Sequence, residues 1–353
     1  MTKDKTKISY GDYIAKIYDP QTTEQWIADH SIVRPVDGPF DLRLEPDPDK
    51  VEIPPALLGN ENAMALANDV SRSRRKNKFD RRKKSGRHPP VLVSEGDSWF
   101  QFPVLVEDII DGLDRDYLIY SLDAAGDKLS NMIYGPPRKG KREFLDGLDY
   151  TKKDVRGFLF SGAGNDILGD DASGKSVLLT LIKKFNGNLN DAVGHIDHAA
   201  LASQLSFIEG AYQSLINDIR AIKAFRTLPI YVHGYDYVFP YPWKENGKPD
   251  PRKPKHAKPD QWLGSIFASK NIADQSLRRD ILMDLIDQLY ARLGGLAAKP
   301  GNENVFIVDC RGAMPKVSDW IDEIHGTSAG FSKVSQRFRD TISNKTPPGN
   351  IHP

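Results

Sequence analysis

The sequence predicts an α/β fold in which a parallel sheet carries helices on both faces. From Val91 onward, short apolar segments alternate with longer segments whose apolar residues recur at helical spacing. This alternation is typical of parallel sheets. The chain has 353 residues, enough for one large domain with an extension or for two modest domains. A compact globular protein with a full hydrophobic core is therefore expected.

The predicted elements follow one another in order from Val91. Five strands are expected, at Val91–Ser94, Tyr117–Ser121, Val155–Ser161, Pro229–His233 and Val305–Asp309. Apolar residues at helical spacing predict helices at Val104–Leu113, Ser176–Phe185, Phe207–Phe225, Ser276–Leu293 and Thr327–Ile342. The clearest amphipathic stripe lies in the fourth of these helices, which is therefore expected to pack on the core.

The N-terminal quarter of the chain has a different character. Residues 1–60 mix aromatic, acidic and proline positions without sustained periodicity, which predicts an irregular segment that wraps the main domain. Residues 61–76 have a weak helical pattern, and the run Arg72–Arg87 contains ten lysine and arginine residues. We therefore expect an N-terminal extension (1–88) with a basic segment (72–87), a main domain (89–345) and a C-terminal tail (346–353).

Two insertions interrupt the alternation of strands and helices. One is rich in Gly, Asn, His and Asp and spans Asn186–His198, and the other is rich in proline and lysine and spans Tyr241–Trp262. Neither has the composition to bury much apolar surface. Both are expected to lie on the surface near strand ends.

Composition excludes several classes of protein. Lysine and arginine total 49 against 48 aspartate and glutamate residues, so the charge of the whole chain does not favour nucleic acid or an acidic substrate. The single cysteine, Cys310, excludes an internal disulfide framework and is expected to be buried at a strand end.

The sequence has neither a secretory signal nor an apolar run of membrane-spanning length. A cytoplasmic location is expected, with export independent of a signal left open.

Ser98 lies where the first predicted strand ends. The strand VLVSEG is followed by Asp97-Ser98-Trp99-Phe100, so Ser98 is expected at the carboxyl edge of the sheet, beside the start of a helix. Ligands of open α/β sheets bind along this edge. Taken alone, Gly-Asp-Ser is equally consistent with a helix N-cap.

Three other strand ends or loops carry matching groups. SLDAAG places the backbone N–H of Gly126 after the second strand, and SGAGND places the side-chain amide of Asn165 after the third. Near the end of the chain, DWIDEIHG contains Asp322 and His325, three residues apart. A carboxylate and an imidazole at this spacing can form the hydrogen bond that fixes the ring tautomer.

Four segments resemble the motifs of the SGNH/GDSL hydrolases in their order and strand context, over roughly residues 91–342. They are GDSW, the glycine loop SLDAAG, GAGND and DEIHGTSAGF. The resemblance implies a three-layer α/β/α, flavodoxin-like fold with esterase, lipase or deacylase activity. It implies the signature residues Ser98, Gly126, Asn165 and His325, with Asp322 completing a triad. The sequence departs from the family pattern at Trp99 in place of leucine, at Gly326 in place of proline, and in the glycine loop, which lacks an asparagine.

The residues themselves predict the same chemistry. Ester cleavage needs a nucleophile activated by a base, and donors directed at the oxygen that becomes negative. His325 would take the proton of Ser98, while the N–H groups of Ser98 and Gly126 and the amide of Asn165 would hold the oxyanion. No metal or organic cofactor is needed. The expected substrate is an acyl ester, either a lipid, an acetylated sugar or a small ester.

Other polar and aromatic residues are candidates for the pocket or for structural roles. Those that could line a substrate pocket are Trp99, His233, Tyr235, Asp236, Tyr241 and Trp243. Asp97 and Asp166 flank signature residues and are expected to orient the local backbone. The cluster His195, Asp197 and His198 lacks the spacing of a helical metal motif, so a solvated or capping role is favoured.

The basic segment Arg72–Arg87 supports an alternative from another class. It could contact an anionic lipid or a nucleic acid, and the chain would then be a non-catalytic binding or scaffold protein on the same fold. Such runs are more often a solvated helix face. Because all signature residues follow Pro90, removal of residues 1–88 is expected to leave the catalytic residues in place.

Overall fold

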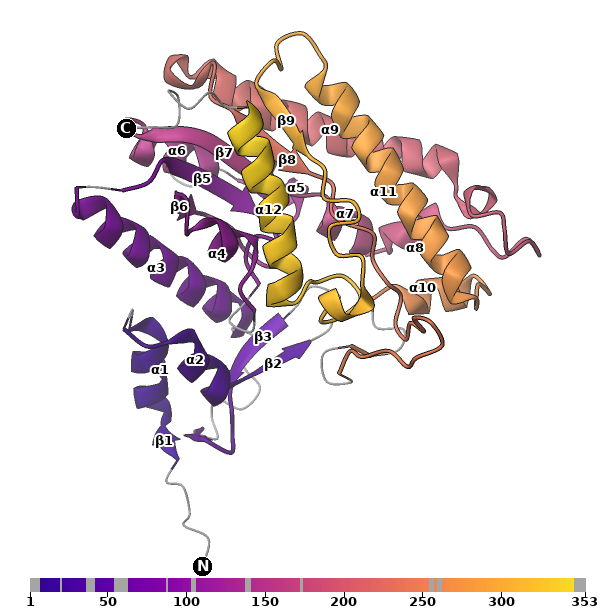
Figure 1. Ribbon diagram of the computed structural model, residues 1–353, viewed down its shortest axis with the longest axis horizontal. Helices are drawn as coiled ribbons and strands as arrows, with labels where there is room; N and C mark the ends of the chain where they lie inside the picture. The colour runs from indigo at the N-terminus through magenta and orange to yellow at the C-terminus, as the bar shows by residue number, and fades with distance from the viewer. Residues whose placement is uncertain are drawn as a thin grey trace, which may run out of the picture.

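Five parallel strands form the central sheet of the computed structural model (Figure 1). The strands are β5 Val91–Gly96, β6 Leu118–Ser121, β7 Val155–Ser161, β8 Ile230–His233 and β9 Val305–Val308. Their order across the sheet is β6-β5-β7-β8-β9, all parallel, which is the 2-1-3-4-5 order of flavodoxin-like folds. The structure describes residues 7–19, 21–35, 42–53, 63–86, 88–102, 106–136, 141–171, 174–253, 257–258 and 262–345. The expected tail, residues 346–353, lies outside the described residues.

Helices cover both faces of this sheet, so the predicted α/β/α arrangement is confirmed. One face carries α4 Ile109–Leu113 and α12 Ser328–Lys345, which pack on each other, and the other carries α6 Glu143–Thr151, α9 His198–Ala221 and α11 Gln275–Ala297. Phe338 of α12 packs against His233, whereas Tyr212 of α9 packs against Phe160. Phe160 is paired with Val232, and successive residues of a strand point to opposite faces, so these contacts lie on opposite sides.

The strands agree with the predicted segments to within two residues at each end, but three helices differ. The predicted helix Ser176–Phe185 is only α8 Val177–Leu181, because Ile182 is extended and pairs with Ile196. In the described part of the predicted helix Val104–Leu113, residues 106–108 are not helical and α4 spans Ile109–Leu113, because Asp108 and Asp111 form a capping box that fixes its start. Helix α9 begins at His198, nine residues before the predicted start, because Asp197 accepts the N–H groups of Ala199 and Ala200.

The N-terminal residues contain short regular elements that periodicity did not reveal. They are β1 Ile8–Ser9, α1 Tyr10–Tyr18, α2 Glu24–His30, β2 Ser31–Pro35, β3 Leu42–Pro46 and β4 Val51–Glu52. Ser9 and Thr23 cap the two helices, which are too short to carry a readable pattern. Of these elements, β1, α1, α2 and β4 contribute to a small buried cluster that includes Tyr13 and Ile17 and is completed by Val70 of the next helix, Ala63–Lys84.

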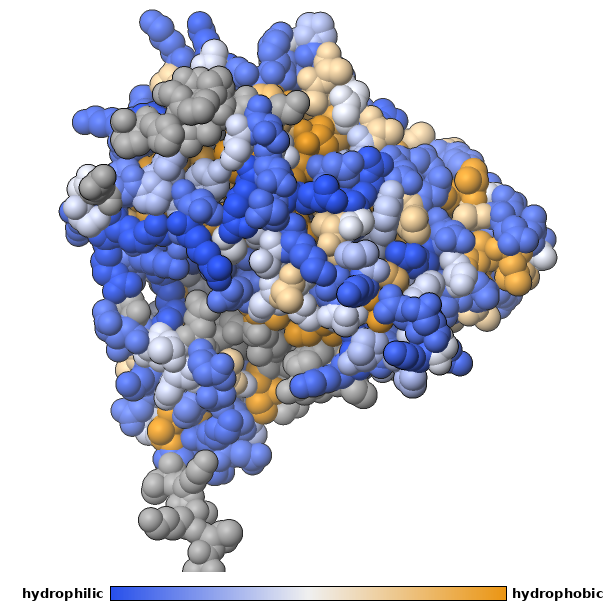
Figure 2. Space-filling view, in the orientation of Figure 1, coloured by the Kyte–Doolittle hydropathy of each residue, from blue (hydrophilic) through white to orange (hydrophobic). Residues whose placement is uncertain are grey.

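Helix α3 Ala63–Lys84 connects these elements to the main sheet. It packs against the edge strand β6, where the buried ring of Phe79 meets Tyr120 edge-on at 5.2 Å between centroids. Figure 1 shows α3 alongside β6, and the surface over it in Figure 2 is predominantly hydrophilic. The basic segment is thus largely a helix seated on the main domain, with Arg87 outside the described residues.

The remaining elements are short and lie mostly near the carboxyl edge of the sheet. They are α5 Leu129–Met132, α7 Gly164–Leu168, α8 Val177–Leu181, η2 Val193–His195, η3 Lys223–Phe225, α10 Gly264–Ser269 and η4 Val317–Asp319. Cys310 is fully buried after β9, as predicted. Within the described part of the chain, no helix combines the length and the apolar character needed to cross a bilayer.

Candidate active site

Ser98 lies in a tight turn at the carboxyl end of β5. The C=O of Asp97 accepts the N–H groups of Phe100 and Gln101, both at 3.0 Å, and so closes a turn around Ser98. The sequence predicted that Ser98 lies beside the start of a helix expected at Val104–Leu113, but α4 begins only at Ile109. The N–H of Ser98 therefore belongs to a turn rather than to a helix N-terminus, and it donates no hydrogen bond within the described residues.

A continuous chain of hydrogen bonds joins Ser98, His325 and Asp322. Nε2 of His325 lies 2.8 Å from Oγ of Ser98, and Nδ1 lies 2.9 Å from Oδ2 of Asp322. The other oxygen of Asp322 accepts the N–H groups of Ile324 and His325. All three side chains are buried. Because the carboxylate accepts the proton on Nδ1, Nε2 is left as the acceptor that faces the serine hydroxyl.

Trp99 connects the turn of Ser98 to the loop of His325. Its indole N–H donates to the C=O of Ile324 at 3.0 Å, and its ring packs edge-on against Phe331 of α12. The ring of His325 lies between Phe102 and Trp262, at centroid distances of 4.6 and 5.4 Å. The large side chain of Trp99 thus fixes the turn of Ser98 relative to the loop of His325.

Two further predicted residues lie in the loops on either side of Ser98. The N–H of Ala124 donates to the C=O of Gly96, so the loop after β6 runs beside the end of β5. Gly126 follows in this loop with φ of +85°, a conformation that glycine adopts without strain. Asn165 is in the first turn of α7, and one of its amide protons is donated to the C=O of Asp127 at 2.6 Å. The second amide proton of Asn165 remains available to a ligand.

A buried hydrogen-bond network lies beneath the turn of Ser98. The hydroxyl of Ser161 donates to Oδ1 of Asp97 at 2.7 Å, and that of Tyr235 donates to Oδ2 at 2.5 Å. Nε2 of His233 lies 2.9 Å from Oγ of Ser161, while Nδ1 accepts the N–H of Tyr235. Burial lowers the pKa of His233 to about 3. The ring is therefore neutral with its proton on Nε2, and every donor of this network has an acceptor.

The hydroxyl of Tyr235 also links the two sides of the site. It accepts the N–H of Gly164, the residue before Asn165, and donates to Asp97, the residue before Ser98. Tyr235 has φ of +68°, which is rare for a bulky residue and is found mainly where the surroundings enforce it. Only its place after the predicted strand β8 pointed to Tyr235 in the sequence.

Glu323 and Arg252 hold the loop 241–262, and sequence reasoning did not find them. The buried carboxylate of Glu323 accepts the N–H groups of Tyr241, Trp262 and Leu263. Burial raises the pKa of this carboxyl even though these bonds oppose the shift. Arg252 donates to the C=O of Asp322 at 2.9 Å and pairs with Asp250. The described part of this loop is therefore anchored to the His325 loop, not only laid on the surface as its composition predicted.

A pocket of about 80 Å³ opens beside Ser98, Asn165 and His325. Its remaining walls are mostly aliphatic: Ile167, Leu168, Leu178, Val238, Leu263, Leu282, Leu285, Ile286 and Ile324. Trp99 and Tyr235 also line it, together with Asp97 and Gly164.

The other pocket candidates lie away from these walls. His233 is enclosed beneath the turn, and Asp236 accepts the N–H groups of Gly312 and Met314. The N–H of Tyr241 is held by Glu323, and Trp243 packs near Phe239.

The histidine-rich insertion and Asp166 have local contacts. Nε2 of His195 accepts the N–H of Asn186, Nδ1 donates to the C=O of Asp191, and Asp197 caps α9. Asp166 accepts the N–H of Leu129, and burial raises the pKa of its carboxyl to about 6. Among the residues that the structure describes, no cluster of His, Cys, Asp or Glu has the arrangement of a metal site.

No protein-family model matches the sequence, and comparison with curated proteins finds no match. Among solved structures, the chain is similar to a Streptococcus pneumonia protein provisionally named a platelet activating factor, with 12% identity and a TM-score of 0.41, over 81% of this chain and 97% of the other. It is also similar to a protein of Agrobacterium tumefaciens strain C58 provisionally named an arylesterase, with 12% identity and a TM-score of 0.36, over 72% and 99% of the two chains. A third similar structure is the N-terminal part of a Bacteroides fragilis protein, which contains a phosphatase domain and was crystallised with Mg. It has 15% identity and a TM-score of 0.37, over 76% of this chain and 56% of the other. At these identities and TM-scores, none of them informs the activity of the chain.

Proposed function

We propose that this protein is a serine-dependent hydrolase of carboxylic esters, of the SGNH/GDSL type. The observation that carries the proposal is the chain of hydrogen bonds from Ser98 through His325 to Asp322, with distances of 2.8 and 2.9 Å. A serine hydroxyl bonded to an imidazole that a buried carboxylate orients is the arrangement that activates a serine nucleophile. The turn of Ser98, the Gly126 loop and Asn165 provide N–H donors beside it for a developing oxyanion.

The proposed reaction has two half-reactions. Oγ of Ser98 attacks the carbonyl carbon of the ester while Nε2 of His325 takes the hydroxyl proton. The N–H groups of Ser98 and Gly126 and the amide of Asn165 stabilise the negative oxygen of the tetrahedral intermediate. His325 then gives its proton to the leaving alcohol, and an acyl-enzyme remains on Ser98. Water, losing a proton to His325, attacks this acyl group, and Ser98 recovers its proton as the carboxylic acid leaves.

A fluorophosphonate probe tests this function directly. We expect the probe to label the protein once, at Ser98, because only an activated serine displaces fluoride from phosphorus at a useful rate. Peptide mapping by mass spectrometry locates the adduct. Matched samples of heat-denatured protein serve as the control and should not react. A folded protein that stays unlabelled, or is labelled at another serine, would count against the nucleophile and would favour the alternative of a non-catalytic binding protein.

The alternative finds less support in the contacts of the basic segment. Arg72, Arg75, Lys78, Arg82 and Lys83 form ion pairs with acidic residues of the main domain. Charges that are paired within the chain contribute little to the attraction of an anionic partner. A contact of this segment with anionic lipid or nucleic acid stays a prediction without a supporting observation.

The aliphatic pocket favours esters with an uncharged acyl chain over acetylated sugars. Each buried methylene contributes about 0.8 kcal/mol, so two more than an acetyl group should raise kcat/KM about tenfold. We therefore expect p-nitrophenyl butanoate to be a better substrate than the acetate. Ile286 is half-buried on the wall, and Ile286→Phe should remove this preference by filling the pocket. Ala291→Phe, at an exposed position of the same helix, is the control. An acetate preference in the unmodified protein would contradict the assignment of the pocket to the acyl group.

A further inference from the structure

Helix α3, from the N-terminal extension, contacts the two loops that carry the proposed catalytic donors. Its residue Asn68 makes two hydrogen bonds with the main chain of Ala125, the residue before Gly126. Oδ1 of Asn68 accepts the N–H of Ala125 at 3.0 Å, and Nδ2 donates to the C=O of Ala125 at 3.1 Å. The same Oδ1 accepts from Nε2 of Gln101, three residues after Ser98, at 2.9 Å. One side-chain amide therefore bridges both loops.

The bond to the C=O of Ala125 determines the direction of the Gly126 N–H. These two groups belong to the same peptide unit, which is planar and trans, so they point in opposite directions. Holding this C=O on α3 makes the N–H of Gly126 point away from α3. Glycine at φ of +85° would otherwise have wide conformational freedom at this position.

Two arginines on the same side of α3 hold the neighbouring main chain. Residues 68, 72 and 75 recur at the spacing of one helix face. Arg72 donates to the C=O groups of Leu122 and Asp123, in the loop that leads to Gly126. Arg75 donates to the C=O of Phe100 at 2.7 Å, in the turn of Ser98. Both loops are therefore bonded to α3 at more than one point.

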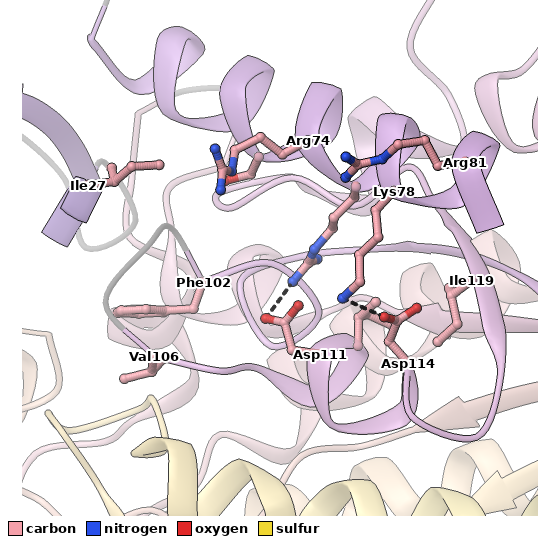
Figure 3. A pocket seen from close by; sticks show the side chains of 12 residues that line it. Ile27, Arg74, Lys78, Arg81, Phe102, Val106, Asp111, Asp114 and Ile119 are labelled. Carbon is pink, nitrogen blue, oxygen red and sulfur yellow. Dashed lines mark hydrogen bonds and ion pairs between the residues drawn. The ribbon is translucent and has the colours of Figure 1, made fainter. Parts of the chain in front are cut away.

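The helix itself is fixed on the main domain, so it can act as a rigid support. Figure 3 shows Lys78 of α3 extending to Asp114, with dashed lines ending at Asp111 and Asp114. These contacts are the ion pair of Arg75 with Asp111 at 3.0 Å and that of Lys78 with Asp114 at 2.6 Å. Arg75 also pairs with the fully buried carboxylate of Asp108 at 2.6 Å.

We propose that Asn68 is a positioning residue for ester hydrolysis, which orients the Gly126 N–H toward the oxyanion by holding the Ala125–Gly126 peptide. This proposal rests on the proposed function, because it explains how one of the proposed oxyanion donors, the Gly126 N–H, is held in its direction. It also replaces the expectation that residues 1–88 are separable from catalysis. Removal of the extension takes away the three side chains that hold the two loops.

The test compares Asn68→Ala with Asn77→Ala in the full-length protein. Asn77 is exposed on the same helix, so the two variants share the change in side chain and in helix propensity. We expect Asn68→Ala to lower kcat about tenfold, the scale of losing hydrogen bonds to a peptide group, with KM changed less than twofold. Asn77→Ala should match the unmodified protein.

A further variant, Arg82→Ala, separates positioning from general loosening of α3. Arg82 donates to the side chain and C=O of Asp114, away from both loops, so Arg82→Ala should lower the melting temperature without lowering kcat. If Asn68→Ala does not fold, the isosteric Asn68→Asp, which cannot donate to the C=O of Ala125, takes its place and should show the same loss of kcat. Equal kcat in Asn68→Ala and Asn77→Ala, or an equal loss of kcat in Arg82→Ala, overturns the proposal. Absence of fluorophosphonate labelling in the unmodified protein instead refutes the proposed function.

Discussion

Replacement of Ser98 by alanine is expected to lower the turnover of a p-nitrophenyl ester by about 10⁶-fold, the scale set by serine triads that act as a unit. The hydroxyl 2.8 Å from Nε2 of His325 is the group that would carry the acyl intermediate. Without it, His325 has no nucleophile to activate, and only the weak catalysis of the remaining donors is left. Turnover is measured under saturating substrate, with protein purified free of host esterases.

Ser335→Ala provides the matched control for this change. Ser335 is also fully buried, and its hydroxyl donates to C=O groups of Ile109 and Phe331 in the packing of α12. Its loss should cost about 1 kcal/mol of stability and leave turnover within twofold. Circular dichroism and thermal melting check that both variants are folded. Activity of the Ser98 variant close to that of the unmodified protein would falsify the assignment of the nucleophile.

Asp322→Asn is expected to lower turnover by about 10⁴-fold while the fold persists. The carboxylate now accepts the proton on Nδ1 of His325, which leaves Nε2 free to take the proton of Ser98. An amide that donates to Nδ1 stabilises the opposite tautomer, in which Nε2 already carries a proton. The measurement is kcat for a small ester, together with the rate of fluorophosphonate labelling, which should fall in parallel.

Asp236→Asn separates this tautomer effect from the general consequence of neutralising a buried aspartate. Asp236 is fully buried and accepts the N–H groups of Tyr237, Gly312 and Met314, with no bond to His325. Its replacement should lower the melting temperature and leave kcat nearly unchanged. If Asp322→Asn retains more than a tenth of the turnover, Asp322 does not set the tautomer of His325.

The sheet, its strand positions and the catalytic candidates could be predicted because their signals are local. Parallel strands end at one edge, so short polar strings that follow them must meet there. Ser98 and Asn165 each lie within a few residues of a strand end, and Asp322 is only three residues from His325. Spacing and strand order were sufficient to bring these residues together.

The supports of the site could not be predicted, because their contacts join distant parts of the chain. Asn68 contacts Ala125 across 57 residues, and Glu323 contacts Tyr241 across 82. Asn68 belongs to no motif, and Glu323, although it lies next to Asp322 in DEIHG, has no feature in the sequence that distinguishes it from an ordinary exposed carboxylate. The bond between Tyr235 and Asp97 depends in addition on a positive φ that a tyrosine rarely adopts.

The packing of α3 on β6 also has a consequence for the order of folding. This helix is rich in charged residues and poor in apolar ones, so its helical conformation is only marginally stable without its acidic partners in the main domain. During synthesis it leaves the ribosome before β6, against which it later packs, and before Val91 of β5 and Asp111 of α4, which its side chains contact. Docking of α3 must therefore wait for strands that are made after it, and such long-range closure is slow. A nascent chain is thus expected to pair β6 with β5 before its earliest long helix packs on them, and the loops of the proposed site gain their support from α3 only at that stage.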